Sequence, residues 1–211
     1  MLRHWKMESK LHVQNNIALY LIILFAILTG IASGLFTASS MSGIQKSALG
    51  SFLETFFQQY TILPFDKTSV FLKSLWQNIQ SVFLIWLSGL FVFGIPFIIL
   101  IVGMRSFFIS FAISFIIGHY YFGGLLFTLL CILPQTLIYL LCYLIIGTLA
   151  MENALKRLKN RKFYHFREQK NRIYVIYTLK ILIVFFLLTF GNVIEAFISP
   201  VFFGLFRWVF S

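Results

Sequence analysis

The sequence predicts an all-α protein: a polytopic integral membrane helical bundle of about five transmembrane helices, with an extracytoplasmic amphipathic helical segment. Two observations carry this prediction. Of the 211 residues, 60% are hydrophobic and 11% are charged, whereas a soluble domain has roughly 45–50% apolar and 25% charged residues. The mean hydropathy is +0.91. A chain of this size cannot bury so many apolar side chains in its interior, so many of them lie on the surface, and that surface must face lipid. The second observation is a series of long uncharged runs.

Five apolar runs have the length of a transmembrane helix, since a hydrocarbon core about 30 Å thick requires roughly 20 apolar residues per helix. None contains Lys or Arg, and Glu195 is their one acid. The first run is too long for the core of a signal peptide, so we expect an uncleaved signal anchor. The predicted spans are 17–37, 81–104, 106–122, 125–150 and 181–204.

The basic residues predict the orientation of these spans. Residues 151–180 hold nine Lys and Arg against two Glu, a net +7 of the chain's +11. Because Lys and Arg in short loops stay cytoplasmic, we expect this loop, residues 1–16 and Arg105 inside the cell. Residues 38–80 and the C-terminus then lie outside. The basic loop is also expected to contact anionic lipid, and its placement beside the membrane argues against nucleic-acid binding.

A second topology stays open at this stage. In it, residues 107–117 and 125–133 are two short half-helices of a re-entrant pair. Each has only about ten residues, far short of the roughly 20 that a full span requires. Pro134 follows the second segment. This arrangement would move the basic loop outside, against the strongest charge asymmetry in the chain.

Residues 38–80 predict two amphipathic helices on the outer surface. Ser51 and Glu54 have the spacing of a capping box, which predicts a helix start there. The segment 63–67 predicts a turn, and a second helix is expected from Thr68. These helices either cover the outer end of the bundle or receive an extracytoplasmic partner. The second has one apolar stripe: Phe71, Leu72, Leu75, Trp76, Ile79, Phe83 and Trp86.

Small residues and prolines predict the shape of the spans. Gly30 and Gly34 form a GxxxG pattern, which allows a neighbouring helix to approach closely. Proline inside a helix removes a hydrogen bond, so the segments Gly94-Ile95-Pro96 and Leu133-Pro134-Gln135 predict kinks in the second and fourth spans. The amide of Gln135 is a candidate donor to a carbonyl that the second kink would free.

Glu195 is the ionisable group placed deepest in a span. It follows Lys180 by a helical distance of roughly 22 Å, and acids at such depth are usually paired or functional. One interpretation is a fastener of the last helix that accepts a hydrogen bond from Asn192 or from a freed amide. The other is a station on a proton or ion path. The substitution Glu195→Gln separates them, since loss of the folded protein indicates a fastener and loss of function alone indicates a path.

The residues combine into no catalytic, cofactor or metal site, so we expect a protein that is not an enzyme. Cys131 and Cys142 are roughly 16 Å apart along one helix, too far for a disulfide. The four histidines are scattered over both predicted sides of the membrane. There is no phosphate-binding loop and no nucleophile elbow.

Several segments, taken in order, resemble the stage II sporulation protein M family. The resemblance runs from the first span to the C-terminal region, and one stretch departs from the glycine-rich G-F-x-x-G-F pattern of relatives: Ser110-Phe111-Ala112-Ile113-Ser114-Phe115. The segments that carry it are Ser74-Leu75-Trp76-Gln77-Asn78, Trp86-Leu87-Ser88-Gly89, Gly94-Ile95-Pro96-Phe97-Ile98-Ile99-Leu100, Leu133-Pro134-Gln135 and Ile194-Glu195-Ala196-Phe197-Ile198-Ser199-Pro200.

The resemblance implies a non-enzymatic scaffold of the engulfment machinery in endospore-forming bacteria. Such a protein lies in the mother-cell membrane at the sporulation septum and anchors the peptidoglycan hydrolases called sporulation proteins D and P. A homo-oligomer is left open. The alternative is a transporter or channel subunit in which the kinked spans and Glu195 line a path. The family motifs mark six shape-setting positions: Gly94, Pro96, Pro134, Gln135, Glu195 and Pro200.

Overall fold

The computed structural model describes residues 16–62, 67–159 and 167–205, and these residues form helices with no strand among them. The predictions for residues 1–15, for most of the 63–67 turn and for the side chain of Pro200 lie outside the described part. The elements are α2 (Ile17–Ser39), α3 (Gly43–Ile62), α4 (Lys67–Gly89), α5 (Gly94–Phe127), the π-helix η1 (Thr128–Ile132), α6 (Leu133–Lys159) and α7 (Arg167–Leu205).

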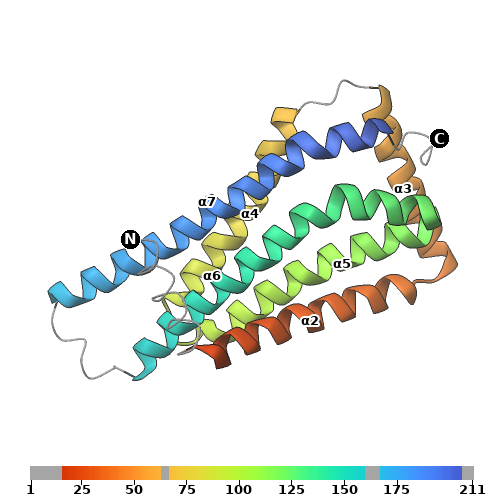
Figure 1. Ribbon diagram of the computed structural model, residues 1–211. Helices are drawn as coiled ribbons and strands as arrows, with labels where there is room; N and C mark the ends of the chain where they lie inside the picture. The colour runs from red at the N-terminus through yellow and green to blue at the C-terminus, as the bar shows by residue number, and fades with distance from the viewer. Residues whose placement is uncertain (1–15, 63–66, 160–166, 206–211) are drawn as a thin grey trace.

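The chain reverses direction inside α5. Tyr121 has φ 49° and ψ −124°, and this one non-helical residue divides Gly94–Phe127 into two helices. After this turn the chain runs back beside its own first half, since the backbone of Gly147 lies against the Val102 side chain. Figure 1 shows the hairpin between α5 and α6. The short half-helices of the re-entrant alternative do not occur, because 107–117 continues a helix from Gly94 and 125–133 continues into α6.

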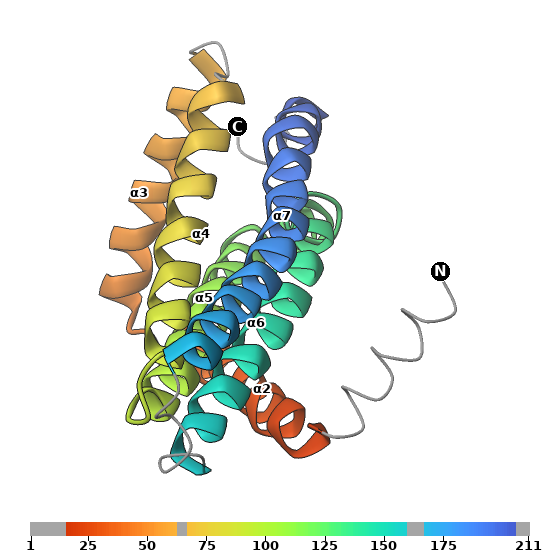
Figure 2. The same cartoon turned by 90° about the vertical axis from the view of Figure 1, so that its left-hand side faces the viewer.

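Long helices pack side by side with alternating directions (Figures 1 and 2). At one end of the bundle, Asn153 of α6 donates a hydrogen bond to the carbonyl of Gly89, and Tyr177 of α7 donates to the carbonyl of Trp86. Helix α3 crosses the opposite end, where Glu54 lies 3.5 Å from His119 of α5. The predicted outer segment and the predicted basic loop therefore lie at opposite ends of the bundle.

Three described segments are long and apolar enough to cross a membrane: Ile17–Ser39, Gly94–Leu158 and Ile173–Phe197. The second contains the reversal at Tyr121 and so supplies two antiparallel helices. Helix α4 packs beside these helices but is less apolar than they are. The five-span count and the orientation of the spans stay predictions.

The predicted boundary at Arg105, between spans 81–104 and 106–122, is wrong. The turn between the two helices lies at residues 90–93, and Arg105 lies within the helix that follows. Gly94 occupies this turn because a Cβ there would collide with the backbone of Ser88. Pro96 does not kink a helix. It lies in the first turn of α5, where its missing N–H has no partner within the helix in any case.

The connections also differ from the predicted loops. Residues 151–180 are mostly helical, because α6 runs to Lys159 and α7 begins at Arg167. Helix α3 starts before Ser51, at a different capping box formed by Ser42 and Gln45. There the backbone N–H of Ser42 donates to Oε1 of Gln45 at 3.1 Å. Glu54 lies inside α3 instead of in its first turn, and its carboxylate lies near His119 of α5.

Pro134 does follow a distortion of its helix. The preceding residues form the π-helix η1, and the N–H of Leu133 donates to the carbonyl of Thr128. A π-turn inserts one residue into a helix and is a recognised response to a local break in the hydrogen-bond ladder. Gln135 does not donate to a freed carbonyl in the described residues, and its buried Oε1 has no hydrogen-bond partner there.

Small residues bring α2 and α5 together. A Cβ on Gly30 would lie closer than 3.0 Å to the backbone of Gly103, and one on Gly34 would meet the backbone of Phe107 and the side chain of Ser110. The GxxxG prediction is therefore confirmed. Ser110, which stands in the stretch that departs from the family pattern, faces Gly34 directly.

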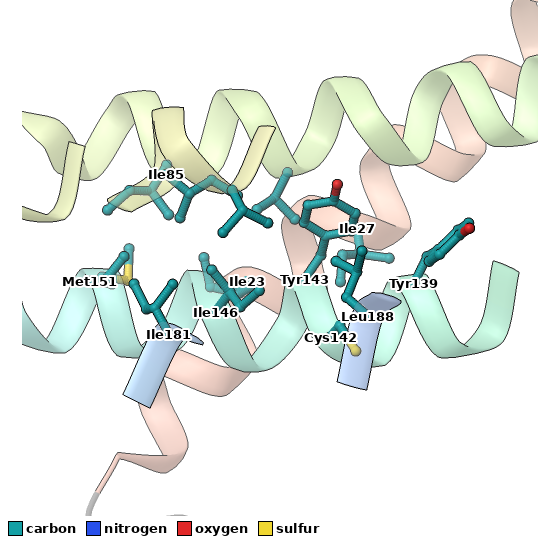
Figure 3. Packing of buried hydrophobic residues seen from close by; sticks show 14 of the residues in the cluster. Ile23, Ile27, Ile85, Tyr139, Cys142, Tyr143, Ile146, Met151, Ile181 and Leu188 are labelled. Atoms are coloured by element: carbon teal, nitrogen blue, oxygen red, sulfur yellow. The ribbon is translucent and has the colours of Figure 1, made fainter. Parts of the chain in front are cut away.

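The core lies where α2, α4, α5, α6 and α7 meet (Figure 3). Buried aliphatic side chains from all five helices surround α6, and Tyr143 points from α6 toward α5 in that view. Fully or almost fully buried members are Ile23, Ile27, Ile85, Ile98, Val102, Ile146, Ile181 and Leu188.

Helix α4 has its apolar stripe on the outside. Trp76 is 62% exposed and Phe83 is 54% exposed, whereas Ser74 and Asn78 are buried. Lipid is as apolar as these aromatic side chains, so they lose nothing by facing it, and the polar side chains gain partners inside the bundle. Asn78 therefore lies on the inward face of α4, in the interior of the bundle.

Candidate functional site

A cluster of polar side chains lies in the middle of the bundle, where four helices meet. Each of the four contributes at least one member, and the members are joined by hydrogen bonds across helices rather than along them. They are Asn78 and Ser81 of α4, Arg105 of α5, Tyr139 and Tyr143 of α6, and Asn192 and Glu195 of α7.

Arg105 is held by α4. Its Nε donates to the hydroxyl of Ser81 at 2.8 Å, and its Nη2 donates to the backbone carbonyl of Gln77 at 2.8 Å and to Oδ1 of Asn78 at 2.9 Å. The guanidinium carbon also lies 5.6 Å from the ring centre of Tyr143, within reach of a cation–π attraction. The prediction that Arg105 lies in a cytoplasmic loop is wrong, because it lies within α5 and its Nε and Nη2 donate to groups of α4.

Asn78 is the hub of the cluster. Its Oδ1 accepts from Arg105 and, at 2.8 Å, from the hydroxyl of Tyr143. Its Nδ2 donates to Oδ1 of Asn192 at 2.7 Å. Asn78 is only 4% exposed, so one amide with no access to water connects α5, α6 and α7 to α4.

Glu195 joins the cluster through Tyr139. The Tyr139 hydroxyl lies 2.7 Å from Oε2 of Glu195 and 2.7 Å from Oδ1 of Asn192. Asn192 is therefore near Glu195, as predicted, but the two side chains meet through the tyrosine. An unbroken series of hydrogen bonds leads from Arg105 through Asn78, Asn192 and Tyr139 to Glu195.

The structure brings three of the predicted site residues together: Arg105, Asn192 and Glu195. Gln135 lies one helical turn from Tyr139 but makes no hydrogen bond to the cluster within the described residues. Gly94 and Pro96 shape the turn before α5, and Pro134 follows η1, so these three positions lie apart from the cluster. Pro200 falls within α7, and its surroundings are outside the described part.

Sequence reasoning missed Asn78, Ser81, Tyr139 and Tyr143. The signal for the first two was present: Ser74, Asn78, Ser81 and Ile85 recur with the period of a helix, which places them on one face of α4. In a water-soluble protein the apolar stripe of a helix faces the interior, and that expectation would send this polar face outward. The tyrosines gave no signal, because Tyr is common in membrane helices as an interfacial side chain.

Two polar atoms beside the series of hydrogen bonds are buried and unpaired. They are Nδ2 of Asn192, whose side chain is fully buried, and Oε1 of Gln135. Unpaired polar atoms are costly in an apolar interior, and ionisable residues at membrane depth are expected to have a role. The cluster is thus both a fastener of four helices and the candidate functional site.

Comparison with known families identifies the family to which the chain belongs. The family model of stage II sporulation protein M (SpoIIM) matches residues 21–200, which is most of the chain. The chain belongs to this family. No curated protein matches it, and no solved structure does. The match includes all seven members of the polar cluster, all of α5 and α2 from Leu21 onward, so it covers most of the described bundle. Membership makes this a sporulation-related membrane protein.

Proposed function

We propose that the chain is a non-enzymatic membrane scaffold of the sporulation engulfment machinery. In this role it anchors the peptidoglycan hydrolases, sporulation proteins D and P, at the septum while the mother-cell membrane surrounds the forespore. The chain itself would cleave no bond. Membership of the family supports a sporulation role, and the polar side chains inside the bundle support a structural one, because most of them pair with each other.

The observation that carries the proposal is the position of α3. This helix lies across the end of the bundle that the charge distribution predicts to be outside, where the hydrolases work. It leaves Ile44 83% exposed and Phe52 65% exposed. Exposure of such large apolar side chains to water is unfavourable, so binding of a partner that covers them would be favoured by their burial.

Capture of the hydrolases from sporulating cells tests the proposal. The full chain is purified in mild detergent, and sporulation proteins D and P are detected with antibodies. We expect both with the wild type, and at least tenfold less of both with the double variant Ile44→Ser and Phe52→Ser. Ser47→Ala, which changes an exposed residue of the same helix, is the matched control. Absence of both hydrolases from the wild-type sample would contradict a scaffold.

A transporter or channel subunit is the second candidate, and the charged residues favour it. Arg105 and Glu195 both lie inside the bundle, connected by polar side chains. Proteoliposomes that contain a pH-sensitive dye measure whether protons cross. A proton flux that disappears with Glu195→Ala would establish this function, and vesicles as tight as protein-free ones would remove it.

We also propose that anionic lipid binds beside the cytoplasmic ends of α6 and α7. A pocket of about 320 Å³ lies there between the two helices, and its polar lining includes Lys156, Lys180 and Glu152, of which Glu152 pairs with Lys156. Two lysines against one carboxylate leave a net positive charge for a phosphate, and the apolar lining residues fit the start of an acyl chain. Replacement of both lysines by Gln is expected to weaken retention of anionic lipid during purification, measured as lipid per protein.

A further inference from the structure

The hydrogen-bond directions in the polar cluster are fixed by Arg105. A guanidinium only donates hydrogen bonds, so the atom of Asn78 that faces it must be the carbonyl oxygen. The Tyr143 hydroxyl meets the same oxygen and donates as well. The amide nitrogen of Asn78 therefore points the other way, toward Asn192, and Asn192 must present its own oxygen there.

This order reaches the Tyr139 hydroxyl, which has one proton and two neighbours. Oδ1 of Asn192 and Oε2 of Glu195 both lie 2.7 Å from it. The Asn192 oxygen has no proton to give, so Tyr139 donates to Asn192. The remaining short contact, between Tyr139 and Glu195, then requires a proton from the carboxyl group.

The opposite orientation of Asn192 does not satisfy the cluster. Turning that amide over would let its nitrogen, which has no partner, donate to Tyr139 and would free Tyr139 to donate to an ionised Glu195. The same rotation would place two NH₂ groups, those of Asn78 and Asn192, 2.7 Å apart with neither able to accept. The observed orientation also leaves Nδ2 of Asn192 unpaired, but only the opposite one sets two buried donors against each other at hydrogen-bond distance, which is costly.

We infer that Glu195 is a proton-binding site inside the bundle, where it is held as the neutral carboxylic acid and donates its hydrogen bond to Tyr139. Ser74 of α4 also contacts this carboxyl, and Arg105 is the charged group of α5 that faces it. When the proton leaves to water, the Tyr139 hydroxyl turns its own hydrogen from Asn192 to the carboxylate. The series of hydrogen bonds from Arg105 then ends at Asn192. Proton occupancy of Glu195 thus decides whether Tyr139 of α6 is hydrogen-bonded to both Asn192 and Glu195 or to Glu195 alone.

Infrared spectroscopy of the full chain in lipid nanodiscs measures the protonation directly. We expect the wild-type minus Glu195→Gln difference spectrum at neutral pH to contain the carbonyl band of a protonated carboxylic acid, with a shift in D₂O. The matched control is Glu54→Gln, an exposed acid that should give only carboxylate bands. Carboxylate bands alone in the Glu195 difference spectrum would overturn the inference.

Thermal unfolding supplies a second test. The side-chain NH₂ of Gln also donates to Tyr139, so Glu195→Gln is expected to melt at the wild-type temperature. Tyr139→Phe should then lower the melting temperature by the same amount in both backgrounds. A loss of several degrees with Glu195→Gln alone would show that an ionised carboxylate stabilises the wild type and would overturn the inference. The infrared result does not depend on this outcome, because it requires only that Glu195→Gln folds.

Discussion

Helix α5 takes part in two interfaces of opposite character. On one side it packs on α2 through Gly30 and Gly34, where the backbones approach closely and the facing side chains, Ser106 and Ser110, are small. On the other side Arg105 reaches into the polar cluster and pairs with α4. In lipid, apolar burial hardly drives helices together, so close packing and polar pairing remain as the sources of association. The first interface is sensitive to added atoms, and the second is sensitive to lost partners.

The largest expected effect comes from removal of the hub of the polar cluster. Asn78→Leu deprives Arg105, Tyr143 and Asn192 of a partner at once and leaves the half-buried charge of Arg105 less well paired. We expect the free energy of unfolding to fall by about 3 kcal/mol, near the cost of breaking a buried ionic contact. Unfolding in mixed detergent micelles, followed by circular dichroism, measures the change.

Gln77→Leu is the matched control for the hub. It removes a side-chain amide from the adjacent position of α4, but that side chain is exposed, and only the backbone carbonyl of Gln77 contacts Arg105. Its stability should stay close to that of the wild type. Equal loss with both variants would mean that any polar residue in this part of α4 matters, and that the cluster has no special role.

The second effect tests the close-packed interface. Gly34→Ala adds one methyl group where the backbone of Phe107 and the side chain of Ser110 leave no space. Overpacking of this kind costs about 1–3 kcal/mol. Gly118→Ala adds the same group to α5 at a position with nothing within 4 Å of the new carbon, and should be tolerated. The same unfolding measurement compares them, and tolerance of both variants would show that α2 and α5 can separate at little cost.

These two interfaces also differ in how far the sequence predicts them. The α2 and α5 contact follows from a local pattern, since two glycines four residues apart form a flat strip on any helix. The polar cluster requires long-range knowledge. The sequence predicts a loop at Arg105 because the true turn, residues 90–93, is as apolar as the helices beside it. Hydropathy does not distinguish such an apolar turn from a membrane span.

A similar reason explains the inverted face of α4. Patterns of apolar residues predict which face of a helix is buried only when water surrounds the protein. In lipid the exposed face is the apolar one, so Trp76 and Phe83 lie outside while Asn78 lies inside. Helix ends were misplaced as well, because α6 and α7 extend as regular helices into the basic segment 151–180, where charge rather than hydropathy was the guide.

A smaller effect is expected where the hub keeps its other partners. Tyr143→Phe removes one donor to Oδ1 of Asn78, but Arg105 still donates to that oxygen, and the ring that lies 5.6 Å from the guanidinium is retained. Hydrogen bonds between membrane helices average about 0.6 kcal/mol and reach at most about 1.7 kcal/mol. We expect a loss within that range in the same unfolding measurement. A loss as large as that of Asn78→Leu would mean that Tyr143, not Asn78, is the hub.

The smallest effect on the bundle is expected at its edge, where α3 meets α5. The Glu54 carboxylate and the His119 ring are both partly open to solvent, and such surface pairs contribute about 0.2–1 kcal/mol. Glu54→Gln should therefore leave the unfolding of the bundle almost unchanged but raise amide hydrogen exchange in α3, since few other contacts hold that helix. Thr55→Ala, which changes only a bond within α3, is the control. If Glu54→Gln destabilised the whole bundle instead, α3 would be a structural part of it, and its exposed residues would no longer be free to serve a partner.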